Sequence, residues 1–115
     1  MTTCRKTTLF ANAAIIGIDL DFYNDNAYAF ACRMDKLLHD NPNPYPAKSD
    51  RAAKRKYNEY AGLVGKVFAD GLLYVNGVHD HPKASKAYSI AWEHGHSSGY
   101  AEVSNYFDEL VDLLK

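Results

Sequence analysis

The chain has 115 residues, of which 47% are hydrophobic and 23% are charged, a composition typical of one globular domain with its own core. The formal net charge of -1 excludes a global electrostatic attraction to nucleic acid or to an anionic membrane. The longest apolar run, residues 13–18, is too short to span a bilayer, so we expect no membrane association. Cys4 and Cys32 have neither metal nor redox spacing, which favours a reducing, cytoplasmic location.

Residues 1–23 allow two interpretations. Residues 16–22 alternate strictly between apolar and other residues, as a short strand would. The interpretation that we favour is a short helix from Leu9 to Ile16 that stops at Gly17, after which Asp19 caps a longer helix.

The following segment predicts a helix and then a break. Asn24 can cap a helix, and the segment 41–47 then contains three alternating prolines, through which no helix can pass. We predict that 41–47 is a stiff connector within a single helical domain covering residues 1–115. The residues of the first helix that we expect to face inward are Ala27, Phe30, Ala31, Met34 and Leu38.

The rest of the chain predicts two long helices. Ser49 can cap the first, which ends near Val75 because Asn76-Gly77 supplies a helix stop. Pro82 suits the first turn of the second helix, whose apolar positions continue in phase to Leu114. We therefore predict an all-α fold with at most one short N-terminal strand: a small helical bundle built on a long antiparallel helical hairpin. The second helix carries its stripe at Tyr88, Trp92, Gly95, Gly99, Val103, Tyr106, Leu110 and Leu114.

One part of this second helix is the main candidate binding surface. Aromatic residues at four-residue spacing predict a ladder along one edge, and the chain is rich in tyrosine, with 9 residues. Two glycines in the same stripe predict a notch for close approach of a helix from this chain, a second copy or a partner. The candidate binding residues are Tyr88, Trp92, Gly95, His96, Gly99, Tyr100 and Glu102.

The segment 95–99 also matches the G-x-S-x-G nucleophile elbow around Ser97. That mechanism needs a preceding strand and a later histidine, and no histidine follows His96. We therefore expect no hydrolase and, because no other catalytic set is complete, a non-enzymatic protein.

The histidines and aspartates predict no metal site. His94 and His96 diverge by about 200° on a helix, so they cannot share one ion, and we expect the loop histidines His79 and His81 to be solvated. Asp19-x-Asp21 resembles a calcium loop but lacks its glycine. No cofactor is expected.

A cluster of basic residues precedes and opens the helix after the connector. Its five members are among the 13 basic residues of the chain. We favour a solvated helix face, and the alternative is contact with phosphate or an acidic partner. The patch comprises Lys48, Arg51, Lys54, Arg55 and Lys56.

The run Ala-Trp-Glu-His-Gly-His-Ser-Ser-Gly-Tyr-Ala-Glu-Val, residues 91–103, resembles a segment of small uncharacterised proteins of tailed bacteriophages. Those proteins often continue with Asn-Tyr and an acidic-aliphatic tail, as residues 105–111 do here. The resemblance implies a phage accessory gene expressed in a bacterial host, and it brings no fold, activity or catalytic residue with it.

These observations lead to one functional hypothesis and two alternatives. We expect a phage accessory factor in the host cytoplasm that binds and modulates a host protein, such as a defence or transcription component, through the ridge from Trp92 to Tyr100. The first alternative is a small-ligand or nucleotide pocket near His96, Tyr100 and Glu102, and the second is nucleic-acid binding through Lys48–Lys56. The notched helix also favours a homodimer.

Overall fold

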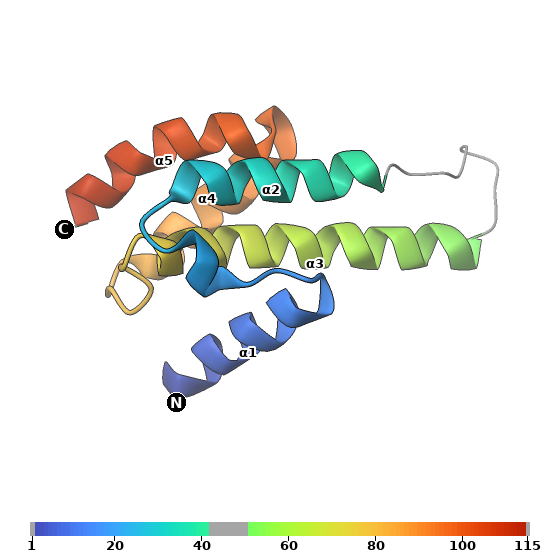
Figure 1. Ribbon diagram of the computed structural model, residues 1–115, viewed down its shortest axis with the longest axis horizontal. Coiled ribbons are helices and arrows are strands. Elements are labelled where there is room, and N and C mark those ends of the chain that lie inside the picture. Colours follow the sequence, from blue (N-terminus) through green and yellow to red (C-terminus); the bar gives the residue numbers. More distant parts are fainter. Residues whose placement is uncertain (1, 42–50, 115) are drawn as a thin grey trace.

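The computed structural model describes residues 2–41 and 51–114, and every regular element in these ranges is helical. The long helix α3 runs along the molecule, with α1 packed on one side and α2 beside it on the other (Figure 1). This arrangement confirms the all-α bundle. The elements are α1 (Thr2–Ile15), the 3-10 turn η1 (Leu20–Tyr23), α2 (Ala27–Asp40), α3 (Arg51–Val75), α4 (Ala84–Ser98) and α5 (Tyr100–Leu114).

The N-terminal segment forms a helix and a turn, so the alternative of a strand at 16–22 is wrong. Gly17 stops α1 as predicted, with φ +76, and Ile18 donates its backbone N–H to the Ala13 carbonyl at 2.9 Å, as in a Schellman motif. Asp19 does act as an N-cap, accepting from the Asp21 backbone N–H at 3.1 Å. It caps only the single turn η1, and not the longer helix that we expected.

The cap of α2 is Asn26, and the prediction of Asn24 is wrong by two residues. The Asn26 side chain accepts from the Ala29 backbone N–H at 3.1 Å, whereas Asn24 closes η1. The helix α2 begins only after the turn η1, and Asp25, which lies between η1 and α2, has a positive φ of 62°. The inward face of α2 is as predicted except that Leu37 replaces Leu38 as its last buried residue.

The helix α3 ends where the sequence predicted. Gly77 has φ +74, and the backbone N–H groups of Gly77 and Val78 donate to the carbonyls of Tyr74 and Leu73 at 3.0 Å each. These two hydrogen bonds define a Schellman cap. The connector 42–47 and the predicted cap Ser49 lie outside the described residues.

The prediction of one long final helix is wrong, because the chain reverses at Gly99. This residue has φ +84, and it separates α4 from α5. A straight helix over residues 82–114 would be about 50 Å long at 1.5 Å per residue, whereas the longest extent of the whole molecule is 47 Å. The reversal instead brings α5 against α2 while α4 packs on α3. The bundle therefore contains two successive short-loop hairpins, α3–α4 and α4–α5.

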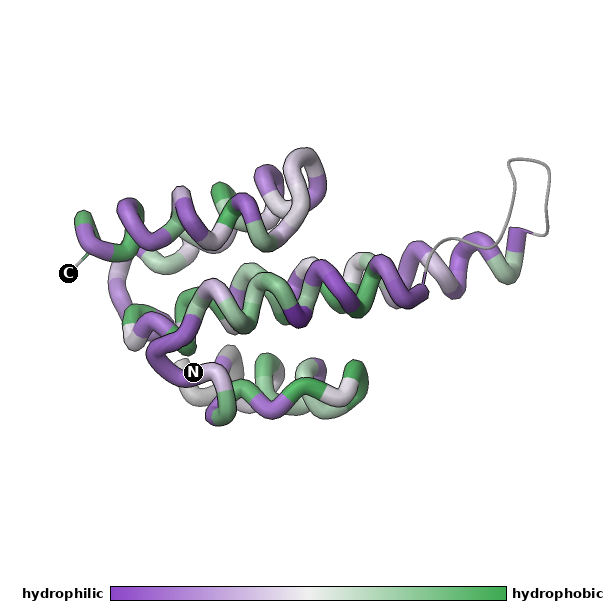
Figure 2. The backbone as a smooth tube through the Cα atoms, turned by 45° about the horizontal axis from the view of Figure 1, so that its top comes forward, coloured by the Kyte–Doolittle hydropathy of each residue, from purple (hydrophilic) through white to green (hydrophobic). Residues whose placement is uncertain are grey.

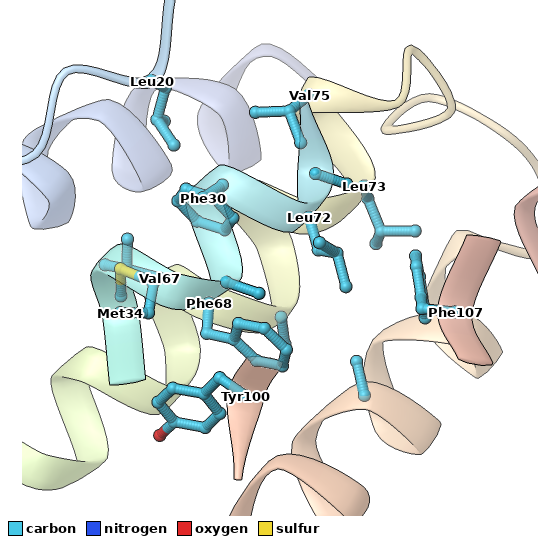
Figure 3. Packing of buried hydrophobic residues seen from close by; sticks show 14 of the residues in the cluster. Leu20, Phe30, Met34, Val67, Phe68, Leu72, Leu73, Val75, Tyr100 and Phe107 are labelled. Carbon is cyan, nitrogen blue, oxygen red and sulfur yellow. The ribbon is translucent and has the colours of Figure 1, made fainter. Parts of the chain in front are cut away.

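An aromatic stack at the centre of the bundle joins α2, α3 and α5 (Figure 3). The ring of Phe68 lies between Phe30, at a centroid distance of 6.3 Å, and Tyr100, at 4.3 Å, and both pairs are near parallel. Gly95 of α4 packs against the Tyr100 end of the stack, so closely that a β-carbon at this position would lie 2.7 Å from Tyr100 Cε1. No described helix is both long and apolar enough to cross a membrane.

Candidate interaction surface

The predicted aromatic ladder forms over three of its four residues on α4. Tyr88 and Trp92 are nearly parallel with centroids 6.5 Å apart, and His96 meets Trp92 edge-on at 4.4 Å. The indole of Trp92 lies directly against Gly65 of α3, so close that a β-carbon at Gly65 would overlap the ring. Trp92 is therefore half-buried as a structural contact between α3 and α4, and His96 is exposed.

Tyr100 belongs to the core and not to the ladder. Because the chain reverses at Gly99, the ring of Tyr100 turns inward onto Phe68 and is 2% exposed. Burial, followed by the nearby charge of Asp35 and by Tyr57, raises the pKa of Tyr100 to about 12. Among the described residues its hydroxyl has no hydrogen-bond partner.

The predicted notch of two glycines within one helix does not form, whereas close approach to Gly95 from within this chain is confirmed. Gly95 is approached by the side chains of Tyr100 and Phe68, and Gly99 lies between helices instead of within one. Side chains of this chain therefore occupy the space at Gly95.

The three residues of the predicted ligand pocket point into different environments. Tyr100 is buried, whereas His96 on α4 and Glu102 in the first turn of α5 are exposed. A pocket lined by all three remains a prediction without geometric support. Ser97 lies in the last turn of α4, where its hydroxyl donates to the Glu93 carbonyl at 3.1 Å, as in an ordinary helix.

The basic patch lies on the exposed, largely hydrophilic first turns of α3 (Figure 2). Its members Arg51, Lys54 and Arg55 line one shallow hollow together with Asn58 and Glu59. Lys56 is exposed beside them, and Lys48 lies outside the described residues.

The basic hollow and the ladder lie on the two helices of one pair, α3 and α4. These helices form an antiparallel hairpin in which Trp92 contacts Gly65. The hollow begins at Asn58, about 10 Å before Gly65 along α3 at 1.5 Å per residue. Apart from the backbone of α3 itself, no described atom lies within 4 Å of a β-carbon built on Gly62, so the surface of the pair is open there. We call this surface the α3–α4 face; it comprises Arg51, Lys54, Arg55, Asn58, Gly62, Trp92 and His96.

A second surface, the hairpin groove, lies on the outer side of α4 and α5. Sequence reasoning missed it because it treated residues 82–114 as one helix with one apolar stripe. The groove has a volume of about 170 Å³, and Leu113 on its wall is 83% exposed. Its lining residues are Lys83, Lys86, Ala87, Ile90, Leu110, Leu113 and Leu114.

The histidines are dispersed, and one of them is not solvated as expected. His79 is 6% exposed, with its Nε2 atom 3.7 Å from Asp70 Oδ1. His81 accepts the Lys83 backbone N–H on Nδ1 at 3.0 Å. Within residues 2–41 and 51–114, no group of three or more potential ligands is placed to hold a metal ion.

The fold and these surfaces define a small all-α domain with two exposed faces on either side of α4. The chain belongs to DUF8546, a family of unknown function, which matches residues 26–115. Comparison with curated proteins and with solved structures gives no match. The family match begins at Asn26, the N-cap of α2, so it includes both exposed faces and excludes α1 and η1.

Proposed function

We propose that this chain is a non-enzymatic phage accessory factor that binds and modulates a host protein through the α3–α4 face. The resemblance of residues 91–103 to segments of phage proteins supports the phage assignment. A host defence or transcription component is the class of partner that such accessory factors would meet in the bacterial cytoplasm.

The observation that carries the proposal is the contact of Trp92 with Gly65. That contact packs α4 on α3, so exposed His96 and the half-buried indole lie on the same helix pair as the basic hollow. Trp and Arg are enriched among the few residues that carry most of the energy of a binding surface, and both occur on this face.

The charge of the face selects the chemistry of the partner. Its cations, Arg51, Lys54 and Arg55, favour an acidic surface. Glu59 lies in the same hollow, and the whole chain carries a net charge of -1. The hollow attracts anions, and a protein surface of mixed charge can pair with its cations and with Glu59, whereas a phosphate backbone pairs with the cations alone, so we favour an acidic protein over nucleic acid.

Affinity capture from a bacterial lysate tests the proposal with matched variants. Lys54→Glu and His96→Ala should each weaken capture of the partner by about tenfold or more, the effect of one central contact. The matched controls are Lys36→Glu and His39→Ala on α2, which change the same residue types at exposed positions and should leave capture intact.

Nuclease treatment separates the remaining alternatives. A partner that survives treatment and is lost in both test variants supports the proposal. Binding that disappears with nuclease, weakens with salt and depends on Lys54 would replace it with nucleic-acid binding. Equal loss in test and control variants would contradict the assignment of this face.

A further inference from the structure

We propose that His79 is a pH-sensitive latch: as an imidazolium it fastens the loop between α3 and α4 to α3, and loss of its proton weakens that hold. The loop covers residues 76–83, between Val75 at the end of α3 and Ala84 at the start of α4. The basic hollow lies at the other end of α3, so the proposal is independent of the host-binding function.

The first observation is that His79 is buried although it belongs to a loop. It is 6% exposed, and its neighbour Val78 is buried as well and donates its backbone N–H to the Leu73 carbonyl at 3.0 Å. The ring of Tyr74 meets the imidazole edge-on at a centroid distance of 6.3 Å. The imidazole is therefore held against the last turns of α3, where the groups that face its two nitrogens determine which protonation state is favoured.

The second observation is that each ring nitrogen of His79 has a carboxylate oxygen within 4 Å. The Nε2 atom lies 3.7 Å from Asp70 Oδ1 on α3, and the Nδ1 atom lies 3.9 Å from Asp80 Oδ1 in the loop. An imidazolium carries a proton on both nitrogens, whereas a neutral ring carries one and turns a lone pair towards a carboxylate. The arrangement favours the imidazolium. Asp70, 19% exposed, contributes more than Asp80, 85% exposed, because water screens an exposed charge.

The helices beside the loop bring further charged or titratable groups, which reach the imidazole through a neighbour. On α1, Lys6 Nζ lies 5.4 Å from the centroid of the Tyr74 ring, and on η1, Asp21 accepts the Tyr74 hydroxyl at 2.8 Å. On α4, Tyr88 lines a small hollow together with Asp70. The positive charge of Lys6 and the negative charge of Asp21 act in opposite directions across Tyr74, so they largely offset each other.

Burial is the effect that opposes an imidazolium, because it removes water from the charged form. The same loss of water strengthens the attraction between the imidazolium and Asp70. Within the loop, His81 accepts the Lys83 backbone N–H on Nδ1 at 3.0 Å, and an accepting nitrogen carries no proton, so this hydrogen bond goes with a neutral His81 ring. Two carboxylates therefore act against burial, and their combined attraction favours the charged form of His79.

The direction of the pH dependence follows from this preference. Histidine in an unfolded chain loses its proton near pH 6.5, to within about one unit. If the fold favours the imidazolium, the stabilisation is fully present below that pH and is lost as pH rises through the higher value at which His79 releases its proton. Above that value the loop should open more often, and the backbone N–H groups of Val78 and His81, which donate to the carbonyls of Leu73 and Val78, should lose protection against hydrogen exchange.

Titration of the imidazole resonances by two-dimensional NMR tests the role of the carboxylates, with the His79 signal assigned by its absence in His79→Gln. Asp70→Asn keeps the shape of the side chain and removes its charge, so it should lower the pH at which His79 loses its proton by about half a unit or more. Asp80→Asn should shift it less in the same direction. The matched control is Asp40→Asn, an exposed carboxylate in the last turn of α2, which should leave the titration of His79 unchanged.

Hydrogen exchange tests the latch itself. After correction for the intrinsic rates, protection of the Val78 and His81 N–H groups in the wild type should fall by about threefold or more between about pH 6 and pH 8.5, the equivalent of half a pH unit. In His79→Gln and in Asp70→Asn, protection should change less over the same interval. The two variants serve as independent comparisons, so the test stands if one of them does not fold by circular dichroism.

Three results would overturn the proposal: a His79 titration that Asp70→Asn leaves unchanged or moves to higher pH, an equal shift in Asp40→Asn, or wild-type protection that falls no more than that of the variants. None of these results bears on partner capture through the α3–α4 face, so the two proposals can fail separately.

Discussion

Gly99 is the residue at which the chain reverses between α4 and α5, and its replacement by alanine tests that reversal. Its φ of +84 and ψ of 149 lie in a region that only glycine occupies at low cost. A β-carbon at this position would contact Asp35 Oδ1 at 3.7 Å, an ordinary distance, so the penalty comes from the backbone and not from a clash. We expect Gly99→Ala to lower the free energy of unfolding by about 1–3 kcal/mol.

The matched control is Gly62→Ala, which makes the same chemical change inside α3. Apart from the backbone of α3 itself, no described atom lies within 4 Å of the new β-carbon, and Gly62 has helical neighbours on both sides. Alanine should therefore stabilise the fold by up to about 1 kcal/mol. Urea denaturation followed by circular dichroism measures both values. If Gly99→Ala were as stable as the wild type, residue 99 would accept a helical conformation and the reversal would be wrong.

Two further predictions concern the packing of the aromatic residues. Gly65→Ala should cost about 1–3 kcal/mol by overpacking and should change the fluorescence of Trp92, the one tryptophan of the chain; unchanged emission would mean that the indole does not lie on Gly65. Tyr100→Phe removes a buried hydroxyl and should be neutral or stabilising at neutral pH. Because the pKa of Tyr100 is raised from 10.0 to about 12, the folded state binds the phenol proton more tightly than the unfolded state. The stability that this tighter binding contributes is fully present below pH 10 and is lost as pH rises towards 12. The variant should therefore lose less stability than the wild type over that alkaline interval, and identical pH profiles would contradict the burial of this phenol.

The helix stops could be predicted from sequence because their causes are local. Gly17 directly follows an apolar run, Gly77 follows Asn76 at the end of another, and each glycine adopts the positive φ that a Schellman cap requires. The course of α3 was predictable for a related reason, since its apolar stripe continues without interruption to Val75. In such segments the residues that determine the structure are neighbours in the chain.

Gly99 shows where this approach fails. It stands in phase with Trp92 and Val103, so the spacing of three and four continues across it and predicts one helix. The reversal is favoured by contacts that are distant in sequence: Tyr100 stacks on Phe68, and α5 packs on α2. A periodic pattern specifies which residues face a core. It does not specify whether these residues belong to one long helix or to two helices with a reversal between them.

The candidate surfaces were harder to predict than the helices, for the same physical reason. The sequence identified Trp92, His96 and the basic residues as separate features, and the contact of Trp92 with Gly65 that sets α4 on α3 depends on the register of the two helices. The hairpin groove depends on the register of α4 against α5, which exists only after the reversal. The burial of His79 beside Asp70 likewise joins residues from a loop and a helix.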